Sequence, residues 1–228
     1  DRLAERVDYQ HGLKLQPEKL AIAYLRGEWS YDSPELVAGF EEMKEIGAVC
    51  TPGFLQRERD TALTDFFNGR AVMVVAPSYE ATSLRALCPF PLGAFRFPYP
   101  REDDPAYGHY TKGPFSEGQL TTGMPFYLSR ATKHRAEALD FLHFMSSQEG
   151  STIFTNVSNW LPVVAGVKPS EFAALFQLQP EGYNWYWGFL GPSNHGDPQN
   201  LVLSVLHTLW SPEGSVAAFR QALRRDME

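Results

Sequence analysis

Residues 65–73 read Asp65-Phe66-Phe67-Asn68-Gly69-Arg70-Ala71-Val72-Met73, and this stretch joins a predicted helix to a predicted strand. The helix is expected over residues 60–68, and Gly69 ends it because glycine readily takes the backbone conformation that closes a helix. Residues 70–76 form a short apolar run with three valines, which is typical of a strand buried in a sheet. Pro77 ends that strand.

Other helices are predicted on both sides of this stretch. The clearest begins at Ser33, whose side chain can cap the free backbone N–H groups, and Gly47 ends it. In the last helix, Ser215 is the predicted cap, and the residues expected to face inward are Val216, Phe219, Ala222 and Leu223. That helix covers residues 215–226, and the remaining predicted elements are strands at 95–97 and 124–128 and helices at 133–147, 148–156 and 199–210. This alternation of helices and short strands predicts an α/β fold.

The composition excludes several classes of protein. Of the 228 residues, 43% are hydrophobic and 14% are aromatic, which rules out an intrinsically disordered chain. The formal net charge of -7 argues against a nucleic-acid-binding protein, since neutralising phosphates requires a basic surface. No run of about 18 apolar residues occurs, so no membrane-spanning helix is predicted.

The two cysteines and the six histidines lack the spacing of a metal site. Cys50 and Cys88 leave two alternatives open, a disulfide between them or buried free thiols. Catalytic and nucleotide-binding motifs such as G-x-S-x-G, H-E-x-x-H, the P-loop and G-x-G-x-x-G do not occur, so the sequence predicts no catalytic residue, metal or cofactor. The start at Asp1 shows no signal-peptide pattern, which predicts a removed targeting segment or a start inside a longer protein.

Aromatic side chains are concentrated in predicted loops. Five of them lie within residues 183–189 (YNWYWGF), Trp160 follows Asn159, and Tyr79 comes shortly after Pro77. Tyr and Trp present a flat apolar face with a polar tip. A sugar ring has the matching character, with C–H groups on one face and hydroxyls around its rim. Two interpretations stay open for these rings, namely packing of the loops against the core and binding of a sugar.

The opening stretch resembles the F-x-x-G-K-A-A-M signature of bacterial extracellular solute-binding proteins of family 1, the maltose-binding-protein-like receptors of ABC importers. In that pattern an aromatic residue six positions after the methionine stacks on the ligand, and Tyr79 holds that position here. Residues 159–163 (NWLPV) are similar to the family's Gly-x-Leu-Pro-Val element, with Asn159 where glycine is common. Further motifs in the family's order occur at residues 29–47, 123–129, 133–150 and 215–226.

The resemblance implies a periplasmic-binding-protein-like α/β fold with two lobes and a ligand cleft between them. Residues 1–112 would supply a portion of the second lobe. Residues 113–158 would form a crossover segment belonging to the first lobe, and residues 159–228 would return to the second lobe with the C-terminal helices. Most of the first lobe has no counterpart in this sequence.

The implied function is that of a substrate-binding protein without catalysis. It would hold a sugar or oligosaccharide in the cleft and deliver it to the permease subunits of an ABC importer. Such a protein is expected to be a monomer in the periplasm or outside the cell, attached to the membrane only through the importer or a lipid anchor. The expected ligand-binding residues are Tyr79, Glu80, Asn159, Trp160, Tyr183, Trp185, Trp187 and Asn194.

Two alternatives to a sugar receptor stay open. The same fold could be tuned for a phosphorylated polyol, a polyamine or a peptide, and the net charge of -7 is compatible with a cationic solute. A glycoside-processing enzyme also uses aromatic surfaces, but it needs two facing carboxylates about 5 to 9.5 Å apart. No specific pair of carboxylates stands out in the sequence.

Overall fold

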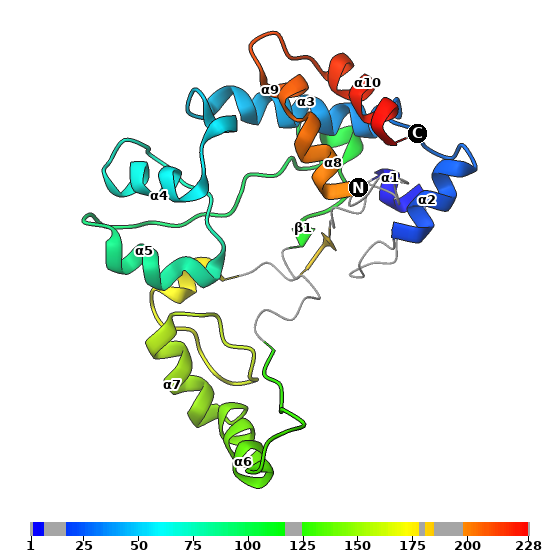
Figure 1. Cartoon of the computed structure of the whole chain (residues 1–228). Coiled ribbons are helices and arrows are strands. Elements are labelled where there is room, and N and C mark those ends of the chain that lie inside the picture. Colours follow the sequence, from blue (N-terminus) through cyan, green and yellow to red (C-terminus); the bar gives the residue numbers. More distant parts are fainter. Residues whose placement is uncertain (1, 7–16, 117–124, 178–180, 185–197, 228) are drawn as a thin grey trace. The chain divides into compact units, whose positions relative to one another are not determined.

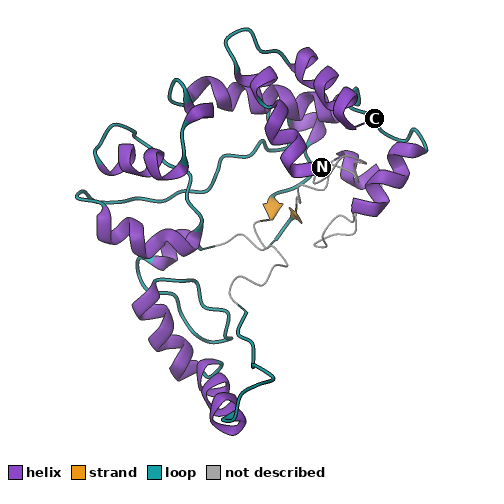
Figure 2. Ribbon diagram, viewed as in Figure 1, coloured by secondary structure: helices purple, strands orange, loops and turns teal. Residues whose placement is uncertain are grey.

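A computed structural model describes residues 2–6, 17–116, 125–177, 181–184 and 198–227 of the chain (Figures 1 and 2). The chain forms two compact units. Unit 1 comprises Asp1–Arg57, Pro98–Leu120 and Leu178–Glu228, and unit 2 comprises Glu58–Phe97 and Thr121–Gln177. The chain therefore enters each unit more than once. The lobe boundaries expected at residues 112 and 158 stay a prediction.

Unit 2 is built from short helices joined by extended segments. Its α-helices are α4 (Arg59–Phe67), α5 (Ala81–Leu87), α6 (Arg135–Met145) and α7 (Gln148–Ser158), and its 3-10 turns are η2 (Ser78–Glu80) and η4 (Ala173–Phe176). The helices predicted at 60–68, 133–147 and 148–156 are confirmed, with small shifts at their ends. Ser147 caps α7, because its side-chain oxygen accepts a hydrogen bond from the N–H of Gly150 at 3.0 Å.

The strands predicted in unit 2 are wrong. Residues 70–76, 95–97 and 125–128, the described part of the third, form no strand. None of their apolar side chains is buried, and Val72 reaches 92% exposure. A strand exists only where a neighbouring strand supplies backbone hydrogen bonds. Among the residues that the structure describes, no second strand pairs with any of these three segments.

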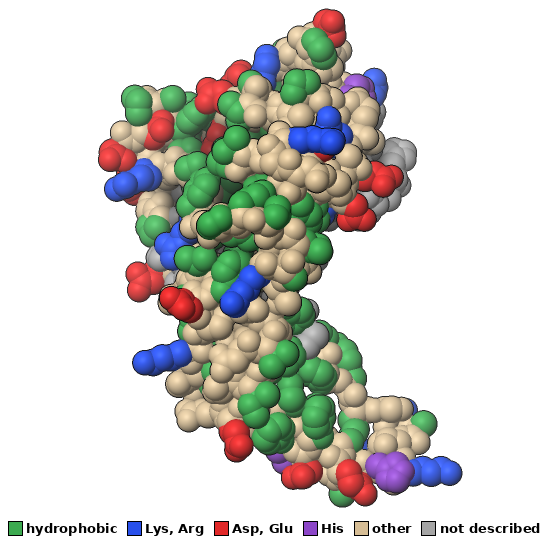
Figure 3. All heavy atoms as spheres, turned by 90° about the vertical axis from the view of Figure 1, so that its left-hand side faces the viewer, with side chains coloured by type: hydrophobic (Ala, Val, Ile, Leu, Met, Phe, Trp, Pro, Cys, Tyr) green, Lys and Arg blue, Asp and Glu red, His purple; other side chains and the backbone are tan. Residues whose placement is uncertain are grey.

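The helices α6 and α7 pack on each other and leave much apolar surface outside that contact. None of the residues of α6 is buried. In the space-filling view, hydrophobic side chains gather on the visible surface of the part of unit 2 that contains these helices (Figure 3). The exposed members on the two helices are Leu139, Phe141, Phe144, Ile153 and Val157.

Unit 1 holds the larger hydrophobic core. Its α-helices are α1 (Arg2–Arg6), α2 (Pro17–Leu25), α3 (Pro34–Val49), α8 (Pro198–Val205), α9 (His207–Trp210) and α10 (Val216–Met227), and two 3-10 turns are η1 (Phe54–Gln56) and η3 (Gly108–Tyr110). The helix α10 packs against α3, α8 and α9 (Figure 1). The fully buried apolar side chains at the centre are Leu3, Leu209, Phe219 and Leu223.

The last helix follows its sequence prediction closely. The hydroxyl of Ser215 accepts a hydrogen bond from the N–H of Ala218 at 3.1 Å, which confirms it as the cap of α10. All four residues predicted to face inward are buried, namely Val216, Phe219, Ala222 and Leu223. The pattern succeeded because a helix buries one continuous stripe of its surface.

The helix α3 differs from its prediction at both ends. The hydroxyl of Ser33 accepts from the N–H of Ser30 at 2.9 Å, outside the helix, and does not cap it. The helix also continues past Gly47 to Val49. Gly47 does not end the helix. Its missing side chain leaves room for a neighbouring aromatic ring to pack closely. A β-carbon at this position would lie 2.3 Å from the Cδ1 atom of Trp210.

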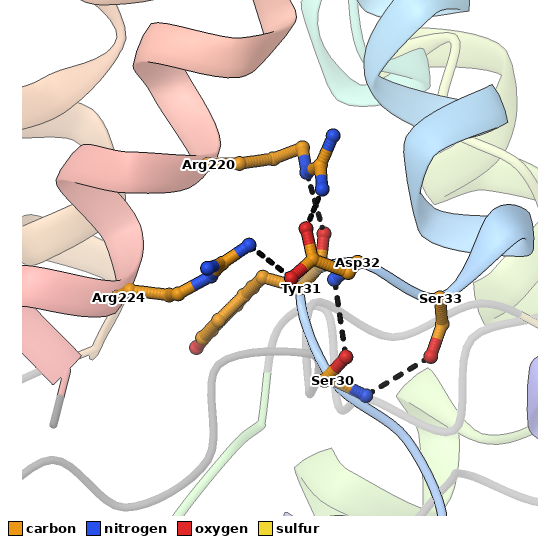
Figure 4. Close-up of polar contacts among 6 residues, drawn as sticks. All are labelled: Ser30, Tyr31, Asp32, Ser33, Arg220 and Arg224. Carbon is orange, nitrogen blue, oxygen red and sulfur yellow. Dashed lines mark hydrogen bonds and ion pairs between the residues drawn. The ribbon is translucent and has the colours of Figure 1, made fainter.

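The turn before α3 is tied to α10 by charged side chains (Figure 4). The carboxylate of Asp32 forms ion pairs with both Arg220 and Arg224, one on each oxygen. Arg220 also donates from Nε to the main-chain oxygen of Tyr31 at 3.0 Å. Two arginines on successive turns of α10 thus hold the chain at the start of α3.

The described part of the chain contains one small parallel sheet, formed by β1 (Phe115–Ser116) and β2 (Tyr183–Asn184) in unit 1. Phe115 lies opposite Tyr183 and Ser116 opposite Asn184. Helices otherwise dominate these residues, so they do not confirm the predicted α/β fold.

Both cysteines are free thiols in the structure, so the alternative of a disulfide is not supported. Cys88 is partly buried. Cys50, which directly follows α3, is exposed, and its thiol lies 3.4 Å from the main-chain oxygen of Ile46. The prediction of a buried thiol is therefore wrong for Cys50, because α3 ends at the surface of unit 1.

Candidate functional site

The structure brings together the two aromatic residues that the sequence singled out most strongly. Tyr79 lies in η2, and Trp160 lies two residues after the end of α7. Their ring centroids are 6.5 Å apart and the ring planes are inclined by 58°. The side chain of Tyr79 is 61% exposed. Two segments of unit 2 that are far apart in the sequence therefore present neighbouring aromatic rings, one of them largely open to solvent.

The indole of Trp160 is held from the side of α7. The ring of Phe154, on the last turns of that helix, meets it edge to face at 5.8 Å between centroids and 89° between planes. The main-chain N–H of Trp160 donates to the hydroxyl of Ser158 at 3.2 Å. Thr82, at the start of α5, donates from its hydroxyl to the carbonyl oxygen of Ser158. The end of α7 is thus joined to the segment that follows Tyr79.

Asn159 is placed between α7 and Trp160 by its backbone. It has a φ of 52° and a ψ of 25°, the left-handed conformation that often ends a helix, and its N–H donates to the carbonyl of Thr155 at 2.9 Å. Glycine and asparagine tolerate this conformation best, which explains why asparagine can stand where glycine is common. The side chain is only 7% exposed.

The side-chain oxygen of Asn159 is used within unit 2. It accepts hydrogen bonds from the hydroxyl of Ser170 at 2.9 Å and from Nη1 of Arg85 at 3.5 Å. The guanidinium of Arg85 lies 5.6 Å from the ring centroid of Phe172, at cation–π distance. Sequence reasoning missed Arg85, Ser170 and Phe172, because only the tertiary structure brings them to Asn159.

Glu80 directly follows Tyr79 and is paired with Arg59 at the start of α4. Nε of Arg59 donates to Oε1 of Glu80 at 3.1 Å, and Nη2 donates to Oε2. Nη1 of the same side chain donates to the main-chain oxygen of Val75 at 3.1 Å. The hydrogen bond with Glu80 raises the pKa of Arg59 above its already high ordinary value. No local sequence signal marks Arg59 as a partner of a residue so far along the chain.

The family model for bacterial extracellular solute-binding proteins matches residues 8–180, which is more than half of the chain. The chain belongs to this family. A search of curated proteins and a search of solved structures each found no match. The members are extracellular solute-binding proteins of ABC transporters, so this chain is a solute-binding protein that acts outside the cytoplasmic membrane. Among the residues described, no helix is long and apolar enough to cross a membrane.

Four further residues of this solute-binding protein were expected to bind the ligand. Trp185, Trp187 and Asn194 lie outside the described residues, and Tyr183 forms β2 with Asn184. In the part of the chain that the structure describes, no group of three His, Cys, Asp or Glu side chains could hold a metal ion. Tyr79, Glu80, Asn159 and Trp160 therefore define the candidate site in unit 2.

Proposed function

We propose that this solute-binding protein takes a carbohydrate, and that Tyr79 and Trp160 form the surface on which a sugar ring stacks. The observation that carries the proposal is their arrangement, with ring centroids 6.5 Å apart and Tyr79 largely exposed. Covering an exposed aromatic face with a ligand removes apolar surface from water, which is favourable. The C–H face of a sugar is a suitable cover, because its hydroxyls remain at the wet rim of the ring.

Polar groups next to the aromatic pair support the same ligand class. Glu80 is adjacent to Tyr79, and each oxygen of its carboxylate has more than one lone pair, so it can accept a sugar hydroxyl while Arg59 remains bound. Asn159 is adjacent to Trp160. We propose that its amide contributes mainly by fixing the position of Trp160, since its oxygen is already engaged by Ser170.

We further propose that the complete receptor is a monomer with the two-lobed fold of its family. Residues 1–112 and 159–228 would contribute to one lobe and residues 113–158 to the other, with Tyr183, Trp185, Trp187 and Asn194 near the ligand. Ligand binding would favour the closed form, which the permease subunits then recognise. This mechanism requires no catalytic residue and no cofactor.

Calorimetric titration with glucose, maltose, cellobiose and maltotriose tests the proposal. Tyr79→Ala should weaken binding of the sugar that the unchanged protein binds by about tenfold, which corresponds to about 1.4 kcal/mol. Tyr79→Phe should bind nearly as well, because it keeps the ring. Tyr127→Ala is the matched control, since Tyr127 is another tyrosine of unit 2 and is 85% exposed.

Calorimetric titration with the other solute classes and an assay of glycoside turnover distinguish the alternatives. Heat from a polyamine, a phosphorylated polyol or a short peptide, but from no sugar, would replace the carbohydrate proposal by another solute class. Turnover of a chromogenic glycoside would identify an enzyme instead of a receptor. If sugars bind but Tyr79→Ala and Trp160→Ala leave their affinities unchanged, the ligand class stands and the proposed stacking surface is wrong.

A further inference from the structure

We propose that Arg59 is a positioning residue for ligand binding, which acts by holding Tyr79 in place beside Trp160. Its role in affinity rests on the proposed function of the aromatic pair. The positioning itself does not require a ligand. Arg59 lies at the start of α4, and its side chain is bound to Glu80 and to the main chain of Val75.

Arg59 forms hydrogen bonds at two places with the segment that carries Tyr79. Towards the N-terminus of the segment, Nη1 donates to the main-chain oxygen of Val75 at 3.1 Å. Towards the C-terminus, Nε and Nη2 donate to the two carboxylate oxygens of Glu80, the residue after Tyr79. A single guanidinium therefore fixes both ends of the short segment 75–80.

This segment needs such support because it is not part of a sheet. Residues 73–77 form neither helix nor strand, no strand lies beside them in the described part of unit 2, and Val75 is 74% exposed. The 3-10 turn η2 that contains Tyr79 is only three residues long. Short turns of this kind contribute little stability by themselves. The position of the Tyr79 ring therefore depends on contacts from outside the segment.

An ordinary surface ion pair would not have this effect. Exposed pairs held by a single contact contribute little, since water screens their charges and their side chains remain mobile. The Arg59 and Glu80 side chains are themselves 46% and 21% exposed, so the geometry of the contact decides its effect. Arg59 instead presents a planar group with donors in fixed directions, which match the two oxygens of a carboxylate and leave a further donor for the carbonyl. Lysine has the same charge, but its three N–H donors diverge from one nitrogen and cannot match the two oxygens of the carboxylate as the planar guanidinium does.

The ligand-free protein provides the first test. Tyrosine and tryptophan rings this close are expected to couple in the near-ultraviolet circular dichroism spectrum. For each protein compared, the contribution of Trp160 is obtained by subtracting the spectrum of the same protein carrying Trp160→Phe. Arg59→Ala should reduce this contribution strongly, and Arg59→Lys should recover only part of it. Arg70→Ala is the control, since Arg70 pairs with Asp65 in the same unit, with 3.4 Å between Nη1 and Oδ1.

The second test is a double-mutant cycle measured with the sugar that the unchanged protein binds in the panel above. Arg59→Ala should weaken binding roughly fivefold, and its effect should be clearly smaller in the Tyr79→Ala background, because most of it passes through the position of the Tyr79 ring. Thermal unfolding of each variant establishes that it is folded.

The outcomes separate this inference from the proposed function. If no sugar binds the unchanged protein, the carbohydrate proposal fails, and the spectra still decide whether Arg59 positions Tyr79. If the Trp160 contribution is the same in Arg59→Ala as in the unchanged protein, the positioning role is wrong. Equal losses of affinity for Arg59→Ala with and without Tyr79 would also overturn it, since Arg59 would then act independently of that ring.

Discussion

The indole Nε1 of Trp210 donates a hydrogen bond to the main-chain oxygen of Met43, at a distance of 2.8 Å. This contact joins α9 to the middle of α3. The ring can approach the helix backbone because Gly47, one turn after Met43, has no side chain. Phe54 packs on the indole, with 5.3 Å between ring centroids. One glycine thus allows an aromatic ring to be packed and hydrogen-bonded at the same place.

Gly47→Ala is expected to destabilise unit 1 by about 1 to 3 kcal/mol, the usual range for adding a methyl group to a filled site. The new β-carbon would lie 2.3 Å from Cδ1 and 2.5 Å from Nε1 of Trp210, so the indole must move and its hydrogen bond to Met43 is lost. Urea unfolding measures the change.

Gly39→Ala is the matched control, because Gly39 lies in the same helix and a β-carbon added there would meet no atom within 4 Å. There alanine should stabilise the protein by about 0.5 to 1 kcal/mol through its higher helix propensity. Equal effects of the two substitutions would show that the indole does not restrict Gly47.

Asp32→Asn should lower the stability of unit 1 by about 1 kcal/mol at low salt, and by less at high salt. The substitution removes the negative charge that Arg220 and Arg224 share (Figure 4). The side chains are partly exposed, so screening limits the effect. Urea unfolding at two salt concentrations measures it. Asp103→Asn should have almost no effect, since its pair with Arg101 is highly exposed, and a comparable loss there would contradict the special role of Asp32.

Tyr107 should make the stability of unit 1 depend on pH in the alkaline range. Burial, and then the hydrogen bond that the phenol donates to Glu45 at 2.7 Å, raise the pKa of Tyr107. Since its proton is held more tightly in the folded protein, this stabilisation is complete below the unfolded pKa of about 10 and declines as the pH rises above it. Tyr107→Phe should lack this decline in urea midpoints measured between about pH 8 and about pH 11. Parallel curves for the two proteins would refute the prediction.

Asn159 should tolerate glycine better than alanine. Asn159→Ala loses the acceptor used by Ser170 and places a β-carbon in the left-handed conformation, which together should cost about 2 kcal/mol. Asn159→Gly loses the same acceptor but keeps an unstrained backbone, so it should be more stable than the alanine variant by about 1 kcal/mol. Unfolding midpoints establish the order. An alanine variant as stable as the glycine variant would mean that the backbone conformation at this position is not restrictive.

Several helices of this protein could be predicted from the sequence because their signals are local, although α1, α2 and α5 were not predicted. The inward-facing stripe of α10 and its cap Ser215 lie within a few turns of one another, and the structure has both as predicted. The same reasoning failed for Gly47, because a glycine that ends a helix and a glycine that makes room for a neighbour look identical in the sequence. Only the position of Trp210 distinguishes them.

By itself, the sequence determined the position of several helices and which residues are candidates for ligand contact, since propensity, caps and aromatic character belong to individual residues and their near neighbours. The tertiary structure decided the rest. Residues 70–76 look like a strand, but a strand requires a partner, and in the described residues none pairs with them. Tyr79 and Trp160 became neighbours, and Arg59 became the partner of Glu80, only when the chain folded back on itself, because contacts between distant residues depend on the path of the whole chain.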